Sequence, residues 1–294
     1  MSSKPLISLA LLLCGIASAF GADSAPAVAY PPFTLEHTEV RDLPFKGPGR
    51  QYQIQIALPA SYHEQKDRRY PVIFVTDGYW DFPMLVGTHN NFIYDKVSPE
   101  CIIVGLGYAG KDLNYGTLRT WDLTPAPVAD SPGNSGHAAE YLALLTQEII
   151  PLVEREYRAD PHHRILAGSS YGGLFTIYAM LTTPETFSAY IAVSPATAAA
   201  NGWIFDYEAK FAKSARPIQA RLFISGAENE WPQFLDAIKR FGQRLDGRQY
   251  SGLHCSFELI KGERHAGTKA EGYARGMRYV LSPLAPESGP MADY

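Results

Sequence analysis

The stretch RILAGSSYGGLFTIYAML, residues 164–181, decides the fold. It starts with an apolar run typical of a buried strand and ends with an apolar run long enough for a helix. Between them lies a G-x-S-x-G pattern, in which Gly168 and Gly172 flank Ser170. A sharp strand-to-helix turn needs small residues two positions either side of its serine, whose hydroxyl then projects above the sheet. We therefore predict that Ser170 is a nucleophile. The alternative, a glycine-rich turn in which Ser169 or Ser170 only caps the helix, is disfavoured because a strand precedes and a helix follows.

Strand-like and helix-like segments alternate on both sides of this turn. Residues 51–59 alternate apolar and polar side chains, as a half-buried strand does, whereas residues 70–76 and 101–105 are continuous apolar runs. Further strands are expected at residues 164–168, 190–193, 221–225 and 256–260, and helices at residues 141–157, 174–181, 234–245 and up to 279. Pro151 is expected to kink or break the first of these helices. Repeated β-then-α units predict an α/β fold, a mostly parallel twisted sheet with helices on both faces.

Residues 1–22 have the features of a secretory signal peptide. Lys4 precedes an apolar run, and Ala17-Ser18-Ala19 supplies a small-residue cleavage site. We therefore expect an exported protein, periplasmic or secreted. Lipid attachment through Cys14 is disfavoured, because Leu13 occupies a position that is usually small in a lipobox. The rest of the chain is expected to form a Pro/Ala-rich tether at 23–33, a single catalytic domain at 34–283 and a tail at 284–294.

The composition of the 294 residues excludes several classes of protein. With 46% hydrophobic and 19% charged residues, the chain is expected to be globular. Lys and Arg total 26 against 30 Asp and Glu, and this charge of −4 without a long basic run argues against nucleic-acid partners. No apolar run reaches the roughly 20 residues of a transmembrane segment, and no metal-ligand spacing is visible, so no metal is expected. Cys101 and Cys255 either pair or are two buried free thiols.

A serine nucleophile needs a base, and hydrolases with such a turn run in the order nucleophile, acid, histidine. His265 lies in the polar, glycine-flanked segment KGERHAG that follows a predicted strand, whereas His254 opens that strand. We therefore predict His265 as the base. The acid is expected after the strand at 221–225, where Glu228 and Glu230 are both candidates. Glu228 is preferred because it is nearer the strand end.

Two backbone amides are expected to bind the oxyanion that forms during ester cleavage. The amide of Tyr171 would lie at the amino end of the helix after Ser170, where the helix dipole favours negative charge. The second donor is expected in the turn after the strand at 70–76, where Gly78 frees the amide of Tyr79 or of Trp80. The long irregular stretch at 108–136 is expected to lie over the crevice at this edge of the sheet.

Several segments together resemble the putative esterase family of α/β-hydrolases, the esterase D and siderophore esterase type. They are YPVIFVTDG (70–78), IIVGLGY (102–108), LRTWDLTP (118–125), EIIPLVEREY (148–157), the Ser170 segment, FSAYIAVSP (187–195) and GERHAG (262–267). The resemblance implies an α/β-hydrolase fold and hydrolysis of carboxylic esters without a cofactor, by Ser170 and His265. It also places Arg119 and Asp122 on a loop that faces the active site. Arg119 either binds substrate or pairs with Asp122 to order the loop.

One departure from the family concerns a wall of the pocket. Relatives often carry S-P-S followed by aromatic residues, whereas this chain has SPATAAANGW at 194–203. Its substrate is therefore left open, although Tyr79, Trp80 and other aromatic residues near strand ends favour aryl, catecholate or sugar esters over long lipids. An acyltransferase with the same site and a non-catalytic binding protein of this fold are the alternatives. The sequence leaves the oligomeric state open.

Overall fold

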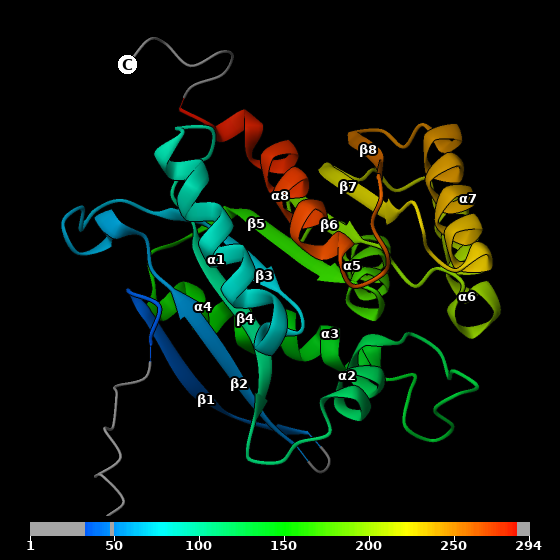
Figure 1. Cartoon of the computed structure of the whole chain (residues 1–294), viewed down its shortest axis with the longest axis horizontal. Helices are drawn as coiled ribbons and strands as arrows, with labels where there is room; N and C mark the ends of the chain where they lie inside the picture. Colours follow the sequence, from blue (N-terminus) through cyan, green and yellow to red (C-terminus); the bar gives the residue numbers. More distant parts are fainter. Residues whose placement is uncertain (1–32, 48–49, 287–294) are drawn as a thin grey trace, which may run out of the picture. The chain divides into compact units, whose positions relative to one another are not determined.

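Eight strands form one sheet in the part of the chain that the computed structural model describes, residues 33–47 and 50–286 (Figure 1). Their order is β1-β2-β4-β3-β5-β6-β7-β8. β1 and β2 pair antiparallel, as do β2 and β4, and the remaining pairs are parallel. The strands are β1 (Thr38–Gly47), β2 (Arg50–Ala57), β3 (Tyr70–Val75), β4 (Ile102–Ala109), β5 (Ala159–Ser169), β6 (Ala189–Val193), β7 (Ala220–Ala227) and β8 (Leu253–Ile260). The predicted mostly parallel sheet is confirmed.

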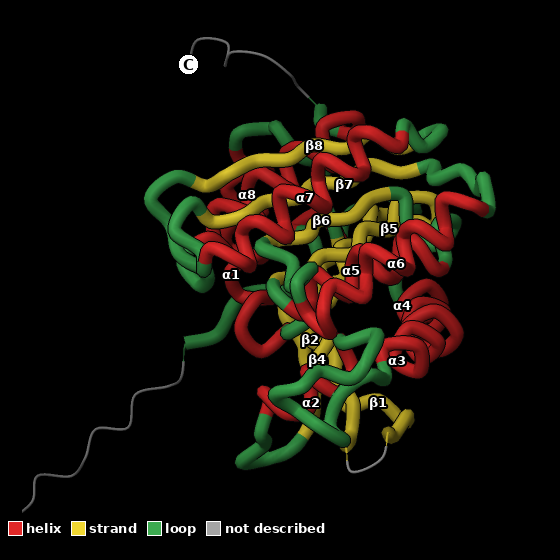
Figure 2. Tube along the Cα trace, turned by 90° about the vertical axis from the view of Figure 1, so that its right-hand side faces the viewer, coloured by secondary structure: helices red, strands yellow, loops and turns green. Residues whose placement is uncertain are grey.

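Helices cover both faces of this sheet. Alternate residues of one strand face opposite cores: Val72 and Phe74 belong to one apolar cluster, and Ile73 and Val75 to the other. The second cluster is covered by α1 (Gly78–Tyr94) and α8 (Thr268–Leu281). The first is covered by α3 (Ala138–Leu144), α4 (Ile150–Glu156), α5 (Tyr171–Thr182), α6 (Ala199–Lys213) and α7 (Pro232–Arg248). Figure 2 shows α1 and α8 on one side of the strands and α4, α5 and α6 on the other.

Pro151 disturbs its helix as predicted. The segment at 141–157 begins in α3, widens into a π-helical turn at Leu145–Ile149 and continues as α4. Proline has no N–H to donate to the preceding turn, and its ring clashes with the carbonyl four residues earlier, so a wider turn accommodates it. Short 3-10 helices lie at Ala60–His63 and Ser282–Leu284.

The stretch at 108–136 is less irregular than expected, because it contains the helix α2 (Tyr115–Leu123). The side chain of Asn114 caps this helix by accepting the Thr117 N–H at 3.1 Å. Asp122 anchors it to the sheet, since the buried carboxylate accepts from Arg50 at 2.7 Å and from Tyr108 at 2.8 Å. Burial raises the pKa of Asp122 to about 6, against the effect of Arg50. α2 is therefore tied to β2 and β4.

The structure tests the prediction for the two cysteines but does not describe the segment predicted to be a signal peptide. The predicted signal peptide at 1–22, Cys14 and most of the tether and tail lie outside the described residues. Among the described helices, none is both long and apolar enough to span a bilayer. The alternative in which Cys101 and Cys255 pair is wrong, because both are free. Cys101 directly precedes β4, and Cys255 lies on the edge strand β8, with four strands between β4 and β8. Cys255 is exposed rather than buried.

Candidate active site

Ser170 lies on a strained turn between β5 and α5. Its backbone has φ 59° and ψ −117°, a conformation that a residue with a side chain rarely adopts. Its side chain makes no capping hydrogen bond, which argues against the simple cap. Its N–H donates to the Val193 carbonyl at 3.0 Å, and its own carbonyl accepts from Ala196 at 2.9 Å. The neighbouring strand and its following loop therefore hold the serine in this conformation.

The two glycines of the motif allow the strand and the helix to approach each other. A Cβ on Gly168 would lie 2.4 Å from the Gly172 carbonyl carbon, and one on Gly172 would lie 2.2 Å from Thr76 Oγ1. Both distances are far inside van der Waals contact. The motif is therefore a steric requirement of this turn.

Gly168→Ala is expected to destabilise the protein by about 1–3 kcal/mol or more, because the clash is with backbone that has to shift. Gly247→Ala is the matched control. Gly247 lies in α7 with no atom within 4 Å of its added Cβ, so alanine there is expected to stabilise by roughly 0.5–1 kcal/mol. Thermal unfolding of both variants checks this, and equal midpoints would contradict the steric argument.

His265 forms a hydrogen bond with Glu230. The ring nitrogen Nδ1 lies 2.8 Å from Oε1 and 3.1 Å from Oε2 of the Glu230 carboxylate, whose side chain is fully buried. A carboxylate there assigns the proton to Nδ1 and leaves Nε2 as the acceptor. The rings of Trp231 and Phe234 have centroids 5.3 and 5.0 Å from the imidazole. His265 is thus oriented by one acid and two aromatic side chains, as a general base requires.

The preference for Glu228 is corrected by this geometry. The Glu228 N–H donates to the Ile260 carbonyl at 2.9 Å, which extends the pairing of β7 with β8. Its exposed carboxylate accepts the Gly262 N–H at 2.8 Å and so holds the loop rather than the imidazole. Nearness to the strand end therefore selected the residue that continues the sheet. The rejected histidine, His254, is exposed on β8.

The turn after β3 presents the second predicted oxyanion donor. Asp77 has a left-handed backbone, with φ 56° and ψ 40°, and α1 starts at Gly78. The Trp80 N–H donates to the Asp77 carbonyl at 2.9 Å, so the amide of Tyr79 is the better candidate of the two left open. The amide of Tyr171 is in the first turn of α5, beside Ser170. First-turn amides have no carbonyl partner within their own helix.

Arg119 pairs with Asp77, not with Asp122. Its Nε and Nη2 bind the two oxygens of Asp77 at 2.7 and 2.8 Å, and Nη2 lies 3.3 Å from the Ser169 carbonyl oxygen. Of the two alternatives for Arg119, the pair with Asp122 is therefore wrong, because Asp122 is held by Arg50. The side chain of Arg119 is 15% exposed. It links α2 to the turn at residues 77–80, the predicted oxyanion turn, and to Ser169, the residue before the predicted nucleophile. No pattern in the sequence marked Asp77 as its partner.

Exposed aromatic rings lie beside both the predicted oxyanion turn and His265. Tyr79 stacks on Tyr115 with centroids 4.7 Å apart, and Trp80 lies 5.7 Å from Tyr115. Tyr79 is 59% exposed, Trp80 44% and Trp231 64%. By contrast, Trp203 stacks on Tyr207, and its ring is tilted against that of Tyr178, which is buried.

Two grooves share Pro232 in their linings, and one of them also contains His265. One, of about 670 Å³, is lined by Glu230, Trp231 and His265. The other, also about 670 Å³, runs between α6 and α7 and is lined by Ala198, Asn201 and Phe205, among others. Ala200 and Asn201 have left-handed backbones, with φ of 50° and 55°. Relatives often carry aromatic residues in the segment that corresponds to 194–203. In this chain small residues of that segment line an open groove instead.

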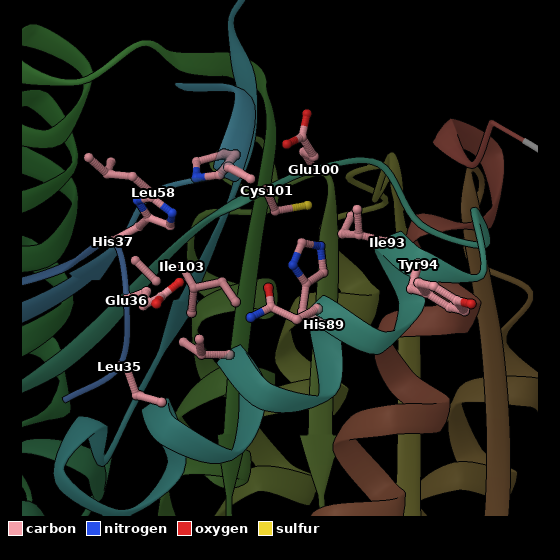
Figure 3. Close-up of a pocket in the computed structure, with 15 residues that line it drawn as sticks. Leu35, Glu36, His37, Leu58, His89, Ile93, Tyr94, Glu100, Cys101 and Ile103 are labelled. Carbon is pink, nitrogen blue, oxygen red and sulfur yellow. The ribbon is translucent and has the colours of Figure 1, made fainter. Parts of the chain in front are cut away.

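A third cavity, of about 400 Å³, lies away from the predicted site residues (Figure 3). It is lined by residues of α1, the end of β2 and the start of β4, including His89 and Cys101. The start of β4 and the end of β5 at Ser169 lie at opposite ends of the strands, because both strands run parallel to β3. His89 Nε2 and Cys101 Sγ both lie within hydrogen-bonding distance of the Pro99 carbonyl oxygen, at 3.0 and 3.4 Å, and burial lowers the pKa of His89. No described group of three or more His, Cys, Asp or Glu side chains is arranged to hold a metal ion.

Known proteins resemble this chain in sequence and fold. A family model described as "Putative esterase" matches residues 46–231. The ferri-bacillibactin esterase BesA of Bacillus subtilis is 27% identical over 276 residues, covering 86% of this chain and 93% of that protein. A siderophore triacetylfusarinine C esterase of Aspergillus fumigatus is 32% identical over 154 residues, 50% of this chain and 52% of that one.

Solved structures share the fold. The BES protein from Bacillus cereus superposes with a TM-score of 0.77 at 23% identity, covering 87% of this chain and 99% of that one. The siderophore hydrolase EstA from Aspergillus nidulans gives 0.74 at 21% identity, with 87% and 99% covered. With the strand order above, these likenesses establish the α/β-hydrolase fold.

Proposed function

The chain belongs to the putative esterase family and is a carboxylic ester hydrolase, and from this premise we propose that it is an exported serine esterase. Ser170 is the nucleophile, His265 the general base and Glu230 the acid that orients His265. The observation that carries this proposal is the His265–Glu230 bond of 2.8 Å. This hydrogen bond gives the proposed base an orienting acid. Both residues follow the carboxyl ends of the parallel strands, as Ser170 does.

The reaction runs in two steps. His265 Nε2 takes the hydroxyl proton as Ser170 Oγ attacks the ester carbonyl, and the Glu230 carboxylate stabilises the imidazolium. The amides of Tyr171 and Tyr79 donate to the oxyanion, which collapses to an acyl-enzyme as the imidazolium protonates the leaving alcohol. Water then attacks the acyl-enzyme with His265 again as base, and the acid product and free Ser170 are released.

The substrate proposed is an aryl or siderophore-type ester. Exposed Tyr79, Trp80 and Trp231 offer aromatic faces beside the oxyanion turn and the base, and such faces stack on planar rings. Arg119 is the proposed cationic contact for an acidic or hydroxylated group. Two relatives are named siderophore esterases, one is named a ferri-bacillibactin esterase, and one is named an endo-1,4-beta-xylanase/feruloyl esterase, from Xylanibacter ruminicola.

A substrate panel tests this proposal. Short and long p-nitrophenyl esters, a ferric siderophore trilactone and feruloylated saccharides are compared by kcat/KM. We expect the aryl and trilactone esters to be cleaved at least about tenfold better than long aliphatic esters, a difference of about 1.4 kcal/mol in transition-state binding. A clear preference for long acyl chains would contradict it. Product analysis with an added alcohol separates hydrolysis from acyl transfer, since the transferase would form a new ester.

Export is proposed from the sequence of residues 1–22. The mature protein is expected to start near Phe20 or Asp23 and to be found in the periplasm or medium. Amino-terminal sequencing after cell fractionation measures both. A mature chain that starts at a lipid-modified Cys14 would instead show membrane anchoring.

A further inference from the structure

The oxyanion turn is followed at once by a buried carboxylate. Asp81 lies in the first turn of α1, two residues after Tyr79, and its side chain is fully buried. Lys269 Nζ lies 2.8 Å from Oδ1, and the Tyr273 hydroxyl donates to Oδ2 at 2.6 Å. Lys269 and Tyr273 are one turn apart on α8. Both oxygens of Asp81 are thus bound by the neighbouring helix.

The two partners of Asp81 come from the element that follows the base. Lys269 is four residues after His265, in the first turn of α8. Its ammonium also lies 5.9 Å from the centroid of the Trp80 ring, which belongs to the oxyanion turn. Lys269 therefore interacts with both Trp80 and Asp81, which follow Tyr79 in the chain. It belongs to α8, the helix that follows the His265 loop.

The other end of the same turn is also held by charge. Asp77 is bound by Arg119 through two bonds, and Arg119 contacts the Ser169 carbonyl. The amide of Tyr79 thus lies between two carboxylates, each tied to a different helix. An oxyanion donor acts only when its nitrogen is about 2.7–3.1 Å from the developing charge, so small displacements of this turn weaken catalysis.

A purely stabilising role for the Asp81 pair is a poor explanation of its burial. Taking two charges out of water costs several kcal/mol per ion by general estimates, and apolar residues of similar size often serve stability as well or better. Burial raises the pKa of Asp81, and the Lys269 ammonium opposes that shift. Hydrogen bonds to both oxygens of Asp81 fix the orientation of α1 relative to α8. An apolar pair would not fix this orientation, because its contacts are not directional.

We propose that Asp81, Lys269 and Tyr273 form a brace that positions the amide of Tyr79 relative to His265. They are positioning residues that act on the transition state without contacting substrate. This inference rests on the proposed function and deepens it, since it adds residues that determine the rate of the same reaction. The Arg119–Asp77 pair is the matching support at the other end of the turn.

Lys269→Met is the first test. We expect kcat for p-nitrophenyl acetate to fall about tenfold or more, as for a weakened oxyanion donor, with KM unchanged within about twofold. The inhibition constant of phenylboronic acid, whose tetrahedral adduct resembles the transition state, should rise by the same factor. Lys269→Arg is expected to recover most of the activity. Arg275→Met is the matched control on the same helix, because Arg275 bonds Glu258 and Glu271 at the surface.

The double variant Asp81→Asn with Lys269→Met separates position from stability. It leaves no unpaired buried charge and keeps an acceptor for Tyr273, so its melting temperature should recover from that of Lys269→Met. Under the proposal kcat stays low. Recovery of kcat together with the melting temperature would overturn the brace, as would a Lys269→Met variant no slower than Arg275→Met.

Tyr273→Phe serves if Lys269→Met does not fold. It removes one hydroxyl and keeps the ring, and a lower kcat with unchanged KM is expected. Full activity in both Tyr273→Phe and the double variant overturns the proposal. The proposed function fails separately: it falls if Ser170→Ala still turns over, whereas an inactive Ser170→Ala beside a fully active Lys269→Met refutes the brace alone.

Discussion

Ser170→Ala is expected to abolish ester hydrolysis, lowering kcat/KM by about 10⁴-fold or more. The substitution removes the attacking oxygen and nothing else, since the backbone turn at φ 59° is set by Gly168, Gly172 and the bonds to Val193 and Ala196. The measurement is turnover of p-nitrophenyl acetate, with the melting temperature as a check that the fold is intact.

Ser188→Ala is the matched control for that loss. Ser188 directly precedes β6, at the end of the strands opposite to Ser170, and its hydroxyl donates to the Arg164 carbonyl at 3.2 Å. Removal of this hydroxyl is therefore expected to leave activity near wild type. If Ser170→Ala keeps measurable turnover above background while folding normally, the nucleophile lies elsewhere and the mechanism proposed above is refuted.

Glu230→Gln is expected to lower kcat by about 10³–10⁴-fold. A neutral amide does not stabilise the imidazolium, and its NH₂ group competes for Nδ1 and so favours the wrong tautomer of His265. Glutamine has nearly the same shape as glutamate, so the 2.8 Å contact with His265 is expected to be kept. The loss then comes from the missing charge and the wrong tautomer and not from altered packing. Rates at saturating substrate, with KM measured alongside, quantify it.

Glu228→Gln separates the two acids within one loop. Its carboxylate accepts the Gly262 N–H, and an amide carbonyl accepts the same bond, so a rate near wild type is expected. A large loss in Glu228→Gln with a near-native Glu230→Gln would reverse the assignment. Near-native rates in both would indicate a Ser–His dyad.

Features that depend on neighbours in the chain were predicted correctly. The turn at Ser170 follows from glycines two positions away, and the alternation of strands and helices follows from the spacing of apolar residues. The position of His265 after the last strand was predicted from the order of elements. Such signals are local, because sterics within a turn and the period of a helix or strand act over a few residues.

The acid that meets His265 is not the one preferred from the sequence. Glu228 and Glu230 differ by two positions, yet one extends the pairing to β8 and the other meets His265. That outcome depends on where β7 pairing ends, which is set by β8, 26 or more residues later in the chain. A rule based on distance from a strand end does not contain this information.

By itself, the sequence determined the α/β fold, the strained serine turn and the loop that carries His265, because each is encoded in adjacent residues. Only the tertiary structure decided which charges meet. Arg119 pairs with Asp77 across 42 positions and Lys269 with Asp81 across 188, although Asp122 is three residues from Arg119. The physical reason is the strand order, which packs α1 beside α8 and the turn after β3 beside the end of β5. A buried charge pairs with whatever opposite charge that packing brings within hydrogen-bond distance, and separation along the chain does not enter.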